Sequence, residues 1–126
     1  MIRHVLCIGQ NKAMNYLIQT VLSSLYQLTI VEDVFYGMQV IRGKKDIGLV
    51  IVDIDYQTKE VLDFISHINS SKLYKKPLII LSNSQREKIH KPLIEHFIYG
   101  YFIKPFNPIE LVKTINELKN RMSVTR

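Results

Sequence analysis

Leu49-Val50-Ile51-Val52-Asp53 is a run of four apolar residues that ends in a carboxylate. Pro77-Leu78-Ile79-Ile80-Leu81-Ser82 is a second apolar run, and it ends in a hydroxyl. Both runs are continuously apolar rather than alternating. Strands that are buried on both faces have this pattern, and such strands occur in parallel sheets covered by helices. The two runs therefore predict the central strands of a parallel α/β sheet.

Three further short apolar runs predict the remaining strands, at Val5–Ile8, Leu28–Val31 and Tyr101–Ile103. The gaps between the five runs are long enough for crossover helices. They also carry helical periodicity, as in the stripe of Val61, Leu62, Ile65 and Ile68. The pattern predicts five βα units. We therefore expect a doubly wound, flavodoxin-like α/β fold with a five-stranded parallel sheet in the order 2-1-3-4-5.

The last two helices have distinct sequence signals. A capping-box pattern begins at Ser84, and Pro92 should kink or split that helix near His90 to Pro92. For the last helix, Asn107 is the expected N-cap and Pro108 the first helical residue. Ile109, Val112, Ile115, Leu118 and Met122 then recur at helical spacing. We expect one domain over residues 1–122 and a tail over residues 123–126.

Composition narrows the classes of function. The chain has 126 residues, 17 of them basic and 11 acidic, which gives a net charge of +6. The single cysteine, Cys7, lies in a predicted strand and excludes an internal disulfide. No apolar run reaches the roughly 20 residues of a membrane span. The apolar stretch at the N-terminus is also too short for a secretory signal, so we expect a cytoplasmic protein that does not bind membranes. The lysines form small scattered groups, which favours simple solvation over nucleic-acid binding, although a basic nucleic-acid surface is a third hypothesis.

Polar side chains follow three of the predicted strands where each strand ends. Ligands of such sheets bind outside the carboxyl ends of the strands. Asp53 supplies a carboxylate there, Ser82 a hydroxyl and Lys104 an ammonium. A carboxylate nucleophile flanked by two groups that stabilise negative charge could accept a phosphoryl group.

These elements together resemble the receiver domain of response regulators in two-component signal transduction, of which the chemotaxis receivers are members. The resemblance covers nearly the whole chain. It implies that Asp53 is the phosphoacceptor, that Ser82 and Tyr101 are switch residues, and that Lys104-Pro105 is a cis peptide. The residues that carry it are Leu49 to Asp53, Pro77 to Ser82, Tyr101-Phe102-Ile103-Lys104-Pro105-Phe106 and Glu32-Asp33-Val34-Phe35-Tyr36-Gly37.

The sequence also departs from the receiver pattern. Receivers have an acidic pair after the first strand that holds a divalent metal, and here Gly9 and Gln10 stand in that region. Receivers usually have a proline four residues after the phosphoacceptor aspartate, and here Gln57 occupies that position. They also have a glycine-containing turn before the next helix, and here Thr58-Lys59-Glu60 stands in its place. We expect Asp55 to be a solvated loop residue; the alternative is that its carboxylate contributes to the crevice.

The main functional hypothesis is a receiver-like module with a degenerate metal site that acts by binding a protein partner. This hypothesis predicts that magnesium binds weakly and that no other cofactor is present. It also predicts an ion pair between Lys104 and Asp53. The alternative is a working phosphorelay receiver, phosphorylated on Asp53 by a histidine kinase, with no other enzymatic activity. We expect the surface for a partner or a homodimer around the helix from Ser84, the last strand and the last helix, with candidates Phe97, Ile98, Tyr99 and Phe106.

Overall fold

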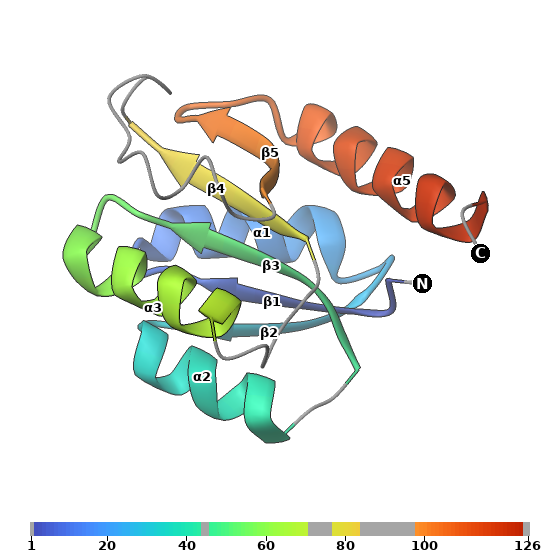
Figure 1. The fold of residues 1–126 in the computed structure, drawn as a ribbon. Coiled ribbons are helices and arrows are strands. Elements are labelled where there is room, and N and C mark those ends of the chain that lie inside the picture. The colour runs from blue at the N-terminus through green and yellow to red at the C-terminus, as the bar shows by residue number, and fades with distance from the viewer. Residues whose placement is uncertain (1, 44–45, 71–76, 84–97, 125–126) are drawn as a thin grey trace.

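The fold is a five-stranded parallel sheet flanked by helices (Figure 1). The computed structural model describes residues 2–43, 46–70, 77–83 and 98–124. The sheet order is β2-β1-β3-β4-β5, and every pairing is parallel, as the sequence predicted. The strands are β1 (His4–Ile8), β2 (Gln27–Val31), β3 (Ile47–Asp53), β4 (Leu78–Ser82) and β5 (Ile98–Ile103).

Helices cover both faces of the sheet. One face packs against α1 (Lys12–Leu22) and α5 (Pro108–Val124). The other packs against α2 (Val34–Gly43) and α3 (Thr58–Ser70). Within the described ranges, none of the helices combines the length and the apolar character that crossing a membrane requires.

The continuous apolar run in β3 reflects its position in the middle of the sheet. Leu49 and Ile51 belong to the core beneath α1 and α5. Val50 and Val52 belong to the core beneath α2 and α3. Because successive side chains point to opposite faces, a strand that is buried on both faces has no place for an exposed polar residue. Each fully buried side chain of this size contributes roughly 1.5–3 kcal/mol of hydrophobic stabilisation.

Several boundaries and exposures differ from the predictions. β3 begins at Ile47 and β5 at Ile98, because pairing with the neighbouring strand extends both beyond their apolar runs. α5 continues to Val124, into the expected tail. Ile109 is 71% exposed, and the buried stripe of this helix is Leu111, Ile115 and Leu118. The helix predicted from Ser84, with its break near Pro92, lies outside the described residues.

The start of α5 follows its sequence signal. The N–H of Ile109 donates to the Asn107 side-chain oxygen at 2.9 Å, which is an N-cap hydrogen bond. Pro108 is the first helical residue, where its missing N–H leaves no helical hydrogen bond unmade. The cap fixes the direction in which the chain leaves Lys104 and enters the helix.

Gly37 lets α2 approach β1 closely, and its replacement should destabilise the domain. A Cβ built at Gly37 would lie 2.5 Å from Cδ1 of the buried Ile8. Gly37→Val should therefore lower the free energy of unfolding by about 1–3 kcal/mol through overpacking. Gly43 ends the same helix, and a Cβ there would meet nothing within 4 Å. Urea unfolding of Gly43→Val should show a change within about 0.5 kcal/mol; equal losses for both variants would refute the close-packing argument.

Candidate functional site

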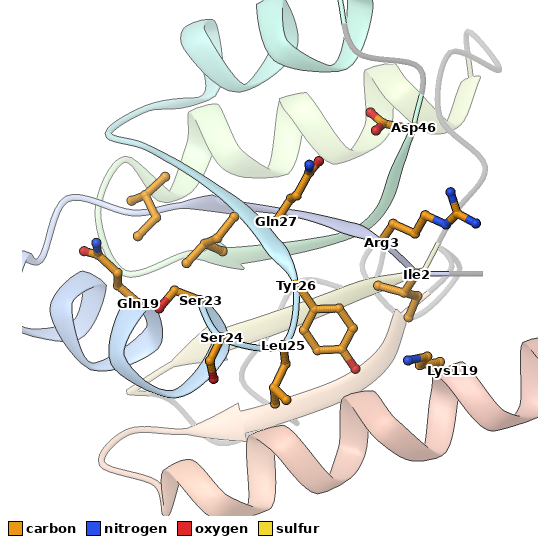
Figure 2. Close-up of a pocket in the computed structure, with 12 residues that line it drawn as sticks. Ile2, Arg3, Gln19, Ser23, Ser24, Leu25, Tyr26, Gln27, Asp46 and Lys119 are labelled. Carbon is orange, nitrogen blue, oxygen red and sulfur yellow. The ribbon is translucent and has the colours of Figure 1, made fainter.

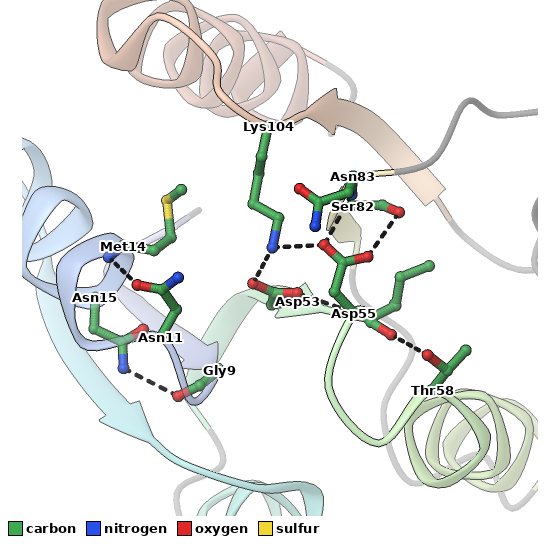
Figure 3. A network of polar contacts seen from close by, with 11 residues as sticks. Gly9, Asn11, Met14, Asn15, Asp53, Asp55, Thr58, Ser82, Asn83 and Lys104 are labelled. Atoms are coloured by element: carbon green, nitrogen blue, oxygen red, sulfur yellow. Dashed lines mark hydrogen bonds and ion pairs between the residues drawn. The ribbon is translucent and has the colours of Figure 1, made fainter.

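The three side chains that the sequence placed at strand ends meet at the carboxyl edge of the sheet (Figure 3). Asp53 is the last residue of β3, Ser82 is the last residue of β4, and Lys104 follows β5. Backbone hydrogen bonds continue past these ends: the N–H of Ile54 donates to Leu81 O at 3.0 Å and that of Lys104 to Ser82 O at 2.9 Å. The sheet ladder therefore sets the spacing of the site.

Lys104 forms a double ion pair at the centre of the site. Its Nζ lies 2.7 Å from Asp53 Oδ2 and 2.6 Å from Asp55 Oδ2. The side chains are only 9% exposed for Lys104, 3% for Asp53 and 18% for Asp55. The predicted contact between Lys104 and Asp53 is confirmed. The expectation that Asp55 is a solvated loop residue is wrong, because its carboxylate is a full member of the network.

Further hydrogen bonds fix the position of Asp55. Ser82 Oγ donates to Asp55 Oδ1 at 3.2 Å, and the N–H of Asn83 donates to Asp55 Oδ2 at 2.8 Å. The N–H of Asp55 itself donates to Asp53 Oδ1 at 2.9 Å. Residues two apart along an extended chain point to the same side. The spacing of the two aspartates was therefore the signal in the sequence that could have placed Asp55 in the site.

Burial and charge shape the ionisation of two groups near the site. Burial alone would lower the pKa of Lys104, but its hydrogen bonds and charge interactions with Asp53 and Asp55 outweigh burial and raise that pKa. Burial, with a smaller contribution from the charge of Asp53, raises the pKa of the Cys7 thiol to about 12. Cys7 is 2% exposed and stays a protonated core residue, as its sequence position predicted.

The loop after β1 reaches Asp53 but brings no carboxylate to it. The N–H of Gly9 donates to Val31 O, and the Asn15 amide donates to Gly9 O, each at 3.0 Å. A Cβ built at Gly9 would lie 3.4 Å from Asp53 Cβ, so position 9 is adjacent to the site. Gln10 is exposed. In the described part of the chain, no three His, Cys, Asp or Glu side chains are grouped so that they could hold a metal ion.

Three other features flank the site. The loop that carries Asp55 ends at Gln57, whose φ of 52° lies in the left-handed region that is uncommon outside glycine. Tyr101 is half-buried and packs against the core beneath α2 and α3. Lys104-Pro105 is a cis peptide, as the resemblance implied.

The residues expected on a partner surface are mostly packed side chains. Phe97 lies outside the described residues. Ile98, Tyr99 and Phe106 are half-buried against the two cores, and the rings of Phe102 and Phe106 lie 5.3 Å apart. Among the described residues of this region, the large exposed apolar side chains are instead Ile103 and Ile109.

Several solved receiver domains share this architecture. The signal receiver domain of an HD domain-containing protein from Pseudomonas fluorescens Pf-5 matches with a TM-score of 0.81 at 21% identity, over 98% of this chain and 99% of that one. Chemotaxis protein CheY4 of Vibrio cholerae matches with a TM-score of 0.80 at 18% identity, over 93% and 98%. A CheY-like receiver domain protein from Methanospirillum hungatei JF-1 matches with a TM-score of 0.83 at 16% identity, over 98% of each chain.

Sequence comparison adds nothing to this structural likeness. No protein-family model and no curated protein matches the sequence. At these low identities the structural likeness concerns the backbone architecture, which agrees along almost the whole length of both chains. The chain therefore has the flavodoxin-like fold of response-regulator receiver domains.

Proposed function

We propose that this protein is a receiver-like signalling module that acts by binding a protein partner and does not depend on phosphorylation of Asp53. Candidate partners are a histidine kinase or a downstream effector. The observation that carries the proposal is the double ion pair, in which the Lys104 ammonium contacts both Asp53 and Asp55. The fold supports the signalling role, since the neighbours named above are receiver domains.

The donor set does not fit the divalent cation that receivers use. Magnesium takes oxygen ligands in a near-octahedral arrangement and is usually held by one or two free carboxylates together with several waters. Here Gly9 and Gln10 add no carboxylate, and the two aspartates already hold an ammonium. Phosphoryl transfer relies on metal ions to neutralise developing charge. This poor fit favours a site that is held in one state by its own lysine.

The described part of the surface offers apolar side chains for a partner around the same edge of the sheet. Five of its exposed large apolar residues lie where a helix begins or a strand ends at this edge, namely Phe35, Tyr36, Tyr56, Ile103 and Ile109. The rings of Phe35 and Tyr36 contact each other, with centroids 5.5 Å apart. Contiguous apolar patches on a protein surface commonly mark interaction sites.

The alternative function is a working phosphorelay receiver that accepts a phosphoryl group on Asp53. The convergence of Asp53, Ser82 and Lys104 favours it, because these residues supply a nucleophile and two groups that stabilise the transferred charge. In that case Lys104 would have to exchange its contact with Asp53 for one with the phosphoryl group.

Titration calorimetry with magnesium distinguishes the two functions. The degenerate site should bind magnesium with millimolar or weaker affinity, because binding must displace or accommodate the Lys104 ammonium. The Asp53→Asn/Asp55→Asn variant is the matched control and should show the same weak heat. Micromolar binding that disappears in this variant would favour the phosphorelay function.

A further inference from the structure

β2 is an outer strand of the sheet with backbone groups directed away from the domain. The N–H of Gln27 donates to Arg3 O at 2.9 Å, and Val31 O accepts from the N–H of Gly9 at 3.0 Å, so these residues face β1. Backbone groups of successive residues in a strand point in opposite directions. The N–H and C=O groups of Leu28 and Ile30 therefore point outward, where no described residue pairs with them.

This edge lacks three of the features that usually prevent strand pairing. Native edge strands commonly carry charges, a proline or a bulge. β2 reads Gln27-Leu28-Thr29-Ile30-Val31, and its pairing with β1 is regular. The opposite edge differs: β5 pairs with β4 through a register shift and is followed directly by Lys104-Pro105. Only one of the two edges is therefore suited to accept another strand.

A groove lies on each side of the β2 edge. The first, of about 980 Å³, runs beside α1 and includes Leu25, Leu28 and Ile30 in its lining (Figure 2). The second, of about 540 Å³, runs beside α2 and includes Tyr36 and Val40. Side chains of an added strand alternate between its two faces. An added strand would therefore place one set of side chains in each groove and cover the exposed Leu25 and Tyr36.

We propose that β2 pairs antiparallel with β2 of a second copy of this chain, with Thr29 on the two-fold axis. In that register Leu28 faces Ile30 of the second copy, and each such pair exchanges two backbone hydrogen bonds. The outward groups of the two copies are thereby satisfied by one another. The two sheets join into one continuous sheet with a closed, isologous interface.

The charges at the ends of β2 favour a second copy over an unrelated strand. The strand itself carries no charged side chain, so no like charges face each other at the centre of the contact. The groove near the amino end of β2 is lined by two basic residues, Arg3 and Lys119, and one acidic residue, Asp46. The carboxyl end of β2 is followed by two acidic residues, Glu32 and Asp33. Antiparallel pairing brings each basic end beside an acidic end of the other copy. The proposal is independent of the chemistry at Asp53.

Cysteine cross-linking tests both the dimer and its register. Residues that face each other at a non-hydrogen-bonded pair have Cα atoms about 4.5 Å apart, within the range that a disulfide spans. Thr29→Cys should therefore give a covalent dimer on mild oxidation. Gln27→Cys is the matched control on the same face. In the proposed register the two copies of residue 27 lie four residues apart along the paired strands, or about 13 Å. This distance is too long for a disulfide, so Gln27→Cys should not form a covalent dimer.

The Thr29 hydroxyl forms a hydrogen bond with His4 at 2.7 Å, and its loss in Thr29→Cys could unfold the strand. A second variant, which keeps Thr29, therefore tests the same pairing. In Gln27→Cys/Val31→Cys, the thiol introduced at position 27 would face the thiol at position 31 of the other copy. Within one chain the same two positions lie about 13 Å apart, too far for a disulfide. This variant should also form a covalent dimer. Sedimentation should show a concentration-dependent dimer for the unmodified chain. A monomer at every concentration, or equal cross-linking of Gln27→Cys and Thr29→Cys, would overturn the proposal.

Discussion

Lys104→Met should lower the free energy of unfolding by about 3 kcal/mol, which is in the range for breaking a buried ion pair by removing one partner. The methionine would leave two neighbouring carboxylates, of Asp53 and Asp55, without the ammonium that contacts both. For a domain of this size the melting temperature should fall by roughly 10 °C. Urea unfolding at neutral pH measures the loss directly.

Two controls separate the ion pair from a general effect of removing a lysine. Lys59 is exposed in the first turn of α3, and Lys59→Met should change stability by no more than about 0.5 kcal/mol. Adding Asp53→Asn and Asp55→Asn to Lys104→Met should recover most of the loss, because no uncompensated charge then remains. A Lys104→Met variant as stable as the unmodified chain would show that the pair contributes nothing.

The difference in the free energy of unfolding between the unmodified chain and Lys104→Met should change with pH in a defined direction. Because the folded state raises the pKa of Lys104, its contribution to stability is complete below the unfolded-state value of about 10.4. That contribution is lost as the pH rises through the higher value of the folded state. The stability difference between the unmodified chain and Lys104→Met should therefore be constant near neutrality and shrink above about pH 10.4.

Gly9→Asp/Gln10→Asp should raise the affinity for magnesium roughly 10- to 100-fold. A side chain at position 9 would begin 3.4 Å from Asp53 Cβ, and Gln10 is exposed, so the structure can accept both aspartates. Opposite unit charges about 4 Å apart attract by about 4 kcal/mol near a protein surface, whereas a tenfold change in affinity needs only about 1.4 kcal/mol. Two added carboxylates therefore provide more than enough attraction, even against the competing Lys104 ammonium.

The matched control for this gain is Gly9→Asn/Gln10→Asn, which adds side chains of nearly the same shape without charge. Calorimetry should show no rise in magnesium affinity for it. If the aspartate variant also shows no rise, the missing acidic pair is not what limits metal binding, and the double ion pair of Lys104 becomes the remaining cause.

The sequence predicted the centre of the sheet better than its margins. The runs at Leu49 and Leu78 identified β3 and β4, because burial on both faces leaves a pattern that needs no tertiary information. The start of β5 was missed because Gly100 interrupts its apolar pattern, and pairing with β4 overrides that local signal. Ile109 fits the apolar spacing of the last helix but is exposed, because periodicity alone does not fix how a helix rotates on the sheet.

The site was predicted in part for the same reason. Strand ends of a parallel sheet meet at one edge, so the convergence of Asp53, Ser82 and Lys104 followed from topology. The role of Asp55 depends on how the loop after β3 folds back toward Asn83, and the sequence carries only the two-residue spacing as a hint. The contact between Asp55 and Lys104 therefore depends on tertiary structure and could not be predicted from the sequence alone.

In the proposed function Asp53 is held by Lys104 and does not accept a phosphoryl group. Incubation of the protein with magnesium and a small phosphodonor, such as acetyl phosphate, followed by measurement of its intact mass, tests this claim. Gly9→Asp/Gln10→Asp provides the comparison with a restored acidic pair, and Asp53→Asn identifies the residue modified. We predict no gain in mass for the unmodified chain. Stoichiometric addition of one phosphoryl group, abolished by Asp53→Asn, would contradict the claim.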